Sequence, residues 1–87
     1  MSWQLYFSKN ARKDAAKLKA VGLQDKTDAL LDILEKDPFT MPPPYEKLVG
    51  DLDGFYSRRI NIKHRLVYRV DKRDKIIFID RMWSHYE

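Results

Sequence analysis

The spacing of hydrophobic positions changes its period along the chain. Residues 3–8, WQLYFS, alternate apolar and polar side chains, which predicts a β-strand. Ser8 can then cap a first helix, and Gly22 is placed to end it in the left-handed conformation. The apolar positions of this helix are Ala11, Ala15 and Leu18. A second helix, expected to end before Pro38, has the apolar stripe Leu23, Thr27, Leu30, Leu31 and Leu34. Two short helices joined across one glycine indicate an antiparallel helical hairpin.

The periodicity breaks at residues 37–48, DPFTMPPPYEKL, whose four prolines predict a stiff and extended segment. Three strand-like runs separated by two turns follow, which predicts an antiparallel meander. These runs are residues 55–61, 64–70 and 75–82. The order β-α-α-β-β-β therefore predicts one α+β domain over residues 1–87. In this fold, a helical hairpin covers one face of a mostly antiparallel sheet and leaves the other face open.

The composition narrows the class of protein. A chain of 87 residues has no room for two domains, and its 44% hydrophobic content is too high for a disordered chain. It contains no cysteine, which excludes disulfides, thiolate metal sites and cysteine nucleophiles and fits a reducing cytoplasm. No apolar run approaches the roughly 20 residues of a membrane helix, and no signal-peptide core is present. We therefore expect a cytoplasmic protein that does not enter membranes.

The net charge of +4 is unevenly distributed. Six of the seven arginines follow position 57, and residues 55–70 contain five cationic residues and no acidic one. Arginine suits forked contacts with phosphate, so this skew favours a phosphate-bearing partner over a merely solvated basic face. Strand alternation puts Arg65 on the open face and residues 66, 68 and 70 towards the helices. By the same rule Arg58 and Arg59 point opposite ways, and one of them must lie near the helices or at the sheet edge, where an acid could pair with it.

Among the possible kinds of catalysis, the sequence is compatible with acid–base chemistry that needs no cofactor. The two histidines, His64 and His85, lack the nearby ligands of a metal site, so no metal is predicted. The sequence has no glycine-rich phosphate loop and no serine in a nucleophile elbow. Acid–base catalysis needs a proton acceptor, a proton donor and a cation where negative charge develops. Taken singly, Glu46 and His85 are more simply interpreted as surface residues, and Trp83 as a residue that closes the core.

The motifs PYEKL, GFYSRRI, HRLVY and the final SHYE, taken together, resemble the Txe/YoeB toxins of the RelE superfamily of bacterial toxin–antitoxin systems. The similarity covers essentially the whole chain and is densest over residues 44–86. The resemblance implies a RelE-like microbial RNase fold. It also implies a metal-independent endoribonuclease, without a cofactor, that cleaves messenger RNA in the ribosomal A site.

The resemblance also implies roles for individual residues. Glu46 would be the general base that deprotonates a ribose 2′-hydroxyl, and His85 the general acid that protonates the departing 5′-oxygen. Arg65 would stabilise the charged phosphorane between them. Arg59 and Tyr86 would bind the substrate.

One position departs from the family pattern. Many relatives carry a lysine three positions after the base, where this chain has Val49. Lys47 lies nearby and is the candidate to bind substrate in its place, although a supporting cation could also be missing.

The resemblance implies a cognate antitoxin, of the YefM/Axe type, as the protein partner. It leaves homodimer formation and codon preference open. Two alternatives remain at this point: a non-catalytic toxin of the ParE type, which inhibits its target by binding, and a module that binds RNA or the ribosome without cleaving. The ParE-type toxins lack the Glu/Arg/His set, which argues against the first of these.

Overall fold

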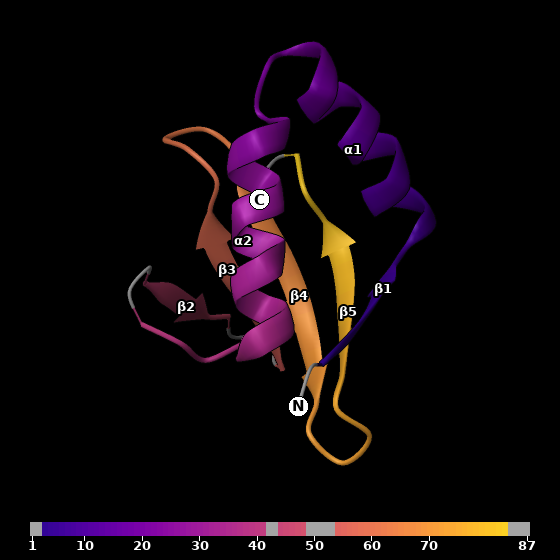
Figure 1. The fold of residues 1–87 in the computed structure, drawn as a ribbon, viewed down its shortest axis with the longest axis vertical. Coiled ribbons are helices and arrows are strands. Elements are labelled where there is room, and N and C mark those ends of the chain that lie inside the picture. Colours follow the sequence, from indigo (N-terminus) through magenta and orange to yellow (C-terminus); the bar gives the residue numbers. More distant parts are fainter. Residues whose placement is uncertain (1–2, 42–43, 49–53, 84–87) are drawn as a thin grey trace.

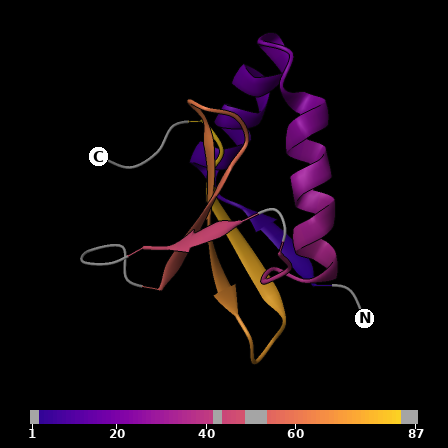
Figure 2. The same cartoon turned by 90° about the vertical axis from the view of Figure 1, so that its left-hand side faces the viewer.

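A computed structural model describes residues 3–41, 44–48 and 54–83 of the chain and arranges them as two helices packed on one face of a five-stranded sheet (Figure 1). Viewed edge-on, both helices lie on the same side of the sheet (Figure 2). This arrangement confirms the predicted α+β class. The elements are β1 (Gln4–Phe7), α1 (Lys9–Ala20), α2 (Gln24–Lys36), β2 (Tyr45–Lys47), β3 (Phe55–Arg59), β4 (Arg65–Asp71) and β5 (Ile76–Arg81).

The helical hairpin begins and turns where the sequence predicts. The Ser8 hydroxyl accepts a hydrogen bond from the Ala11 amide at 2.9 Å, and Gly22 adopts a φ of 78° between the helices. One detail of the first apolar stripe is wrong: Ala15 is exposed, and Asp14 is buried instead. The predicted stripe of α2 is buried or half-buried throughout. Neither helix of the described chain is long and apolar enough to cross a membrane.

The sheet has the strand order β1-β5-β4-β3-β2. The pairs β5–β4, β4–β3 and β3–β2 are antiparallel, whereas β1 runs parallel to β5. The predicted meander is confirmed in β3, β4 and β5. The edge strand β2 was not predicted, because three residues after a proline-rich segment are too few to display an alternating pattern.

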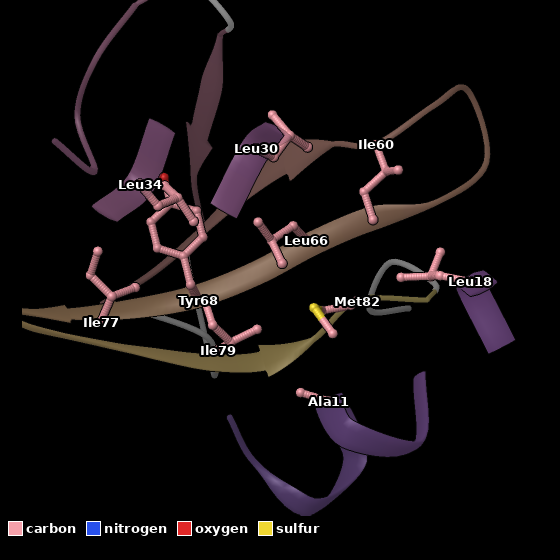
Figure 3. Close-up of a cluster of buried hydrophobic side chains, with 10 residues drawn as sticks. All are labelled: Ala11, Leu18, Leu30, Leu34, Ile60, Leu66, Tyr68, Ile77, Ile79 and Met82. Atoms are coloured by element: carbon pink, nitrogen blue, oxygen red, sulfur yellow. The ribbon is translucent and has the colours of Figure 1, made fainter. Parts of the chain in front are cut away.

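The core lies between the helices and the central strands β4 and β5 (Figure 3). Leu66 and Tyr68, which were predicted to face the helices, are fully buried, and Val70 is half-buried. The core cluster comprises Ala11, Leu18, Leu30, Leu34, Ile60, Leu66, Tyr68, Ile77, Ile79 and Met82. Both helices pack on this face, so charged side chains on the other face of the described sheet can form a site.

Candidate active site

The candidate site lies on the face of the sheet away from the helices, where β2, β3 and β4 run side by side. Glu46 pairs with Ser57 across β2 and β3, and Arg59 pairs with Arg65 across β3 and β4. Directly paired residues project to the same face, and so do residues two apart along one strand. The register therefore brings the carboxylate of Glu46, the hydroxyl of Ser57 and two guanidinium groups to one face.

Arg65 joins these groups through its Nη1 atom. It donates to Glu46 Oε2 at 3.2 Å and to Ser57 Oγ at 3.4 Å. The Arg65 side chain is 22% exposed and that of Glu46 is 62% exposed, so the pair is accessible from solvent. Among the described residues the Nε and Nη2 atoms of Arg65 make no hydrogen bond. These donors therefore remain available for an anionic ligand.

A shallow hollow of about 100 Å³ is formed around this ion pair. It is lined by Pro44, Glu46, Ser57, Arg59 and Arg65. One carboxylate, one hydroxyl and two guanidinium groups converge there. A carboxylate can accept a proton and an arginine can stabilise a charged oxyanion, so the hollow suits proton transfer at a phosphate.

An aromatic cluster holds the strand that carries Glu46. On the helix side of β2, the ring of Tyr45 packs against Phe39 and Tyr56, with ring centroids 6.0 and 5.8 Å away. The guanidinium carbon of Arg58 lies 5.0 Å from the centroid of Tyr45. Since β2 contains only three residues, these contacts fix the position of Glu46 on its other face.

Arg58 faces the opposite way from Arg59, as strand alternation requires, and is only 1% exposed. Its Nη2 atom donates to the carbonyl oxygens of Pro38 and Thr40, at 2.8 and 2.9 Å, and its Nε atom to the Tyr68 hydroxyl at 3.2 Å. It is thus the arginine expected near the helices, and these contacts are with carbonyl and hydroxyl oxygens. Burial raises the pKa of the Tyr68 phenol above its ordinary value, and the charge and hydrogen bond of Arg58 oppose that rise.

Of the remaining predicted site residues, Lys47 is not among those that line this hollow. Lys47 is exposed, but it follows Glu46 directly and therefore projects from the opposite face of β2, as Tyr45 does. His85 and Tyr86 lie outside the described residues. Ser57 is a site residue that sequence reasoning missed. Its position two residues before Arg59 could have identified it, because alternation puts both on one face.

The end of β5, which leads towards His85, is in contact with two other parts of the fold. Trp83 packs against the core cluster, as predicted. Its ring lies 4.3 Å from that of His64, and its carbonyl oxygen is 2.5 Å from His64 Nδ1. His64 is therefore held by its contacts with Trp83.

No group of three or more metal-ligating side chains occurs within the described part of the chain.

Comparison with a family model and with known protein sequences identifies the same family of toxins. Residues 5–86 match the family model described as the YoeB-like toxin of bacterial type II toxin–antitoxin system. A toxin YoeB from Synechocystis sp. is 37% identical over 89 residues, covering 100% of this chain and 91% of that protein.

Solved structures agree with this match over nearly the full chain. A YoeB/ParE toxin from Agrobacterium tumefaciens superposes with a TM-score of 0.86 at 27% identity, covering 95% of this chain and 99% of that one. A YoeB–YefM complex and a YoeB dimer from Staphylococcus aureus each give a TM-score of 0.81 at 34% identity, covering 97% of this chain and 98% of the other.

Proposed function

The chain belongs to the YoeB-like toxins of bacterial type II toxin–antitoxin systems, and on that premise we propose that it is a metal-independent endoribonuclease that cleaves messenger RNA in the ribosomal A site. The observation that carries the proposal is the exposed contact between Glu46 and Arg65, beside Ser57 and Arg59 on the open face. A stable fold does not require an ion pair there, since exposed pairs contribute little to stability. A reaction at a phosphate, in contrast, uses the carboxylate of Glu46 as a proton acceptor and the guanidinium of Arg65 as a cation for the developing negative charge.

The proposed reaction uses a nucleophile that belongs to the substrate. Glu46 accepts the proton of a ribose 2′-hydroxyl while that oxygen attacks the adjacent phosphorus. Arg65 stabilises the added negative charge of the phosphorane through its remaining donors. The bond from phosphorus to the 5′-oxygen then breaks, and His85 donates a proton to that oxygen. The products are a 2′,3′-cyclic phosphate on one fragment and a 5′-hydroxyl on the other.

Two further residues would hold the substrate. Arg59 lines the same hollow and supplies a second cation for the backbone. Tyr86 would stack on an unpaired base, a contact worth roughly 1–3 kcal/mol. Lys47 projects from the other face of β2, so its contribution would be to longer-range attraction of RNA and not to the reacting phosphate.

We also propose that a cognate antitoxin of the YefM/Axe type inhibits the toxin in the cytoplasm. The Staphylococcus aureus relative is described in a complex with YefM. The open face carries Arg59 and Arg65, which would suit an acidic segment that folds on binding. A homodimer is compatible with the dimer of the same relative.

The test is primer extension on messenger RNA bound to translating ribosomes. Wild-type toxin should produce new 5′ ends that carry a hydroxyl, within the A-site codon. Glu46→Ala, Arg65→Ala and His85→Ala should each lower the cleavage rate by about 10²–10⁴, a range typical of acid–base groups and of groups that stabilise developing charge. Stalled translation on an intact message would overturn the proposal in favour of a binding toxin.

Two controls separate chemistry from folding and from metal dependence. Leu66→Ala, a core truncation, should lower the free energy of unfolding by about 2–5 kcal/mol, whereas the three site variants should unfold close to wild type. Cleavage should also survive chelation by EDTA under conditions that keep the ribosome intact. A loss of cleavage that added metal restores would disprove the metal-independent mechanism.

A further inference from the structure

The end of β5 is held beyond the point where its neighbouring strands stop pairing with it. The register with β1 ends at Ile79, and the register with β4 ends at Arg81. Four main-chain atoms between Ile79 and Trp83 are bonded to Ser8, which caps α1, to Asp14 of α1 and to His64 in the turn between β3 and β4, and the last two of these bonds lie beyond the strand pairing. These bonds are Ser8 N to Ile79 O at 2.9 Å, Ser8 Oγ to Asp80 O at 2.7 Å, Met82 N to Asp14 Oδ2 at 3.0 Å, and His64 Nδ1 to Trp83 O.

Asp14 makes the first contact beyond the strand itself. It is 6% exposed and comes from α1, where it takes a buried position that an apolar residue would otherwise fill. Its carboxylate accepts from the Met82 amide, and no other hydrogen bond to it occurs within the described residues. Charge-assisted hydrogen bonds are shorter and stronger than neutral ones, and a buried carboxylate without such a partner is costly. Among the described residues, the Met82 amide is therefore the one hydrogen-bond donor to the Asp14 carboxylate.

His64, in the turn between β3 and β4, makes the second contact. A carbonyl oxygen can only accept, so Nδ1 of His64 must carry the proton that is donated to Trp83. The ring is oriented by its packing on the Trp83 indole, and the His64 amide donates to Asn61 Oδ1 at 2.8 Å. The turn between β3 and β4 thus presents a fixed donor to the last described carbonyl.

We infer that Asp14 and His64 are positioning residues for the proposed general acid His85. The inference rests on the proposed function. Together they fix the N–H of Met82 and the C=O of Trp83, and His85 follows Trp83 by two residues in the sequence. Side-chain groups thus replace strand pairing up to two residues before the proton donor. A proton donor must be held within about 0.5 Å of its productive position, and a misplacement of about 1 Å can cost 10²-fold in rate.

The first experiment compares two substitutions at Asp14 in the ribosome cleavage assay. Asp14→Ala removes the acceptor, whereas Asp14→Asn keeps an acceptor oxygen of the same shape. We expect Asp14→Ala to lower the cleavage rate at saturating toxin by at least about tenfold with the half-saturating concentration unchanged, and Asp14→Asn to recover most of the rate. Asp32→Ala, which removes an exposed acid from α2, should cleave like wild type.

Two substitutions at His64 separate its donor from its ring and remain informative if Asp14→Ala does not fold. His64→Phe keeps an aromatic ring against Trp83 without a donor, and His64→Asn keeps a donor near the position of Nδ1. His64→Asn should retain more cleavage than His64→Phe. Hydrogen exchange of the Met82 amide should quicken in Asp14→Ala while amides of β4 stay protected, which reports the loosened chain end without reference to activity.

Three outcomes decide the inference. Wild-type saturating rates in both Asp14→Ala and His64→Phe would overturn it, even if Glu46→Ala is inactive and the proposed reaction stands. A rate loss that disappears once temperature is lowered to equalise the folded fraction would also overturn it, because the residues would then serve stability alone. If Glu46→Ala and Arg65→Ala cleave normally, the proposed function itself fails, and the inference fails with it.

Discussion

Arg58 and Arg59 are adjacent in sequence and have opposite surroundings. Arg58 is buried against main-chain carbonyls and Tyr68, whereas Arg59 is exposed and lines the candidate site. Strand alternation predicts that the two point apart, but it cannot say which one is buried. That choice depends on where the carbonyls of Pro38 and Thr40 lie, and these come from a segment without periodicity. The two arginines therefore give a matched pair for mutation.

Replacing each arginine by alanine should separate stability from RNA binding. Arg58→Ala leaves buried oxygens without donors and opens a cavity, so it should lower the free energy of unfolding by roughly 2–5 kcal/mol. Arg59→Ala should change it by less than about 0.5 kcal/mol, as for other exposed positions. It should, however, weaken RNA binding and reduce the salt dependence of that binding. Urea unfolding and binding titrations at two salt concentrations measure both effects, and equal destabilisation by the two variants would contradict the structure.

The buried Tyr68 hydroxyl makes stability depend on alkaline pH. Burial raises the pKa of this phenol above 10.0, so the folded protein holds the proton more tightly than the unfolded chain does. The resulting stabilisation is complete below pH 10.0 and is lost as pH rises through the folded-state pKa. The free energy of unfolding should therefore fall more steeply above pH 10.0 in the wild type than in Tyr68→Phe. Parallel curves for the two proteins, measured by urea unfolding at each pH, would show that the phenol titrates alike in both states.

At the scale of elements, the sequence predicts what is periodic and misses what is held by remote contacts. Both helices repeat an apolar spacing, and the strands β3, β4 and β5 occupy strand-like runs of five or more residues bounded by turns; each of these predicted elements is confirmed. Strand β2 has three residues, and its place depends on ring contacts with Phe39 and Tyr56, which lie outside the strand. The same reason limits prediction of the site. Alternation is enough to assign Arg65 to the open face, but Glu46 was identified only by resemblance to a family.

The aromatic cluster behind β2 should control the site without touching it. Tyr45→Ala removes the ring that packs on Phe39 and Tyr56, so β2 should separate more often from β3. The Leu48 amide, which donates to the Phe55 carbonyl at 2.9 Å, should then exchange faster with solvent. Cleavage should fall by at least about tenfold because Glu46 loses its fixed position.

Tyr45→Phe keeps the ring and is the matched control for this prediction. It should preserve both the slow exchange of Leu48 and the cleavage rate. If Tyr45→Ala exchanges and cleaves like the wild type, the cluster does not hold the strand, and the position of Glu46 must have another cause.

In the whole molecule, one face of the sheet forms the core and the other carries the proposed site. The helices cover one face and supply the core, so the other face can carry charged groups that add little to stability. A domain of this size buries only about 60–65% of its unfolded surface, which leaves a modest margin of stability. Exchange of the exposed residues of the proposed site should thus cost less stability than exchange of core residues.

Deleting residues 84–87 tests this division on the whole molecule. The described core extends to Met82, with Trp83 packed against it, so the shortened chain should fold with a small drop in melting temperature. It should not cleave messenger RNA, because His85 and Tyr86 are removed. It should still bind ribosomes through the cations of its open face, which a sedimentation assay would measure alongside cleavage. A large drop in melting temperature would instead assign these residues to the core, and wild-type cleavage by a folded, shortened chain would exclude them from the active site.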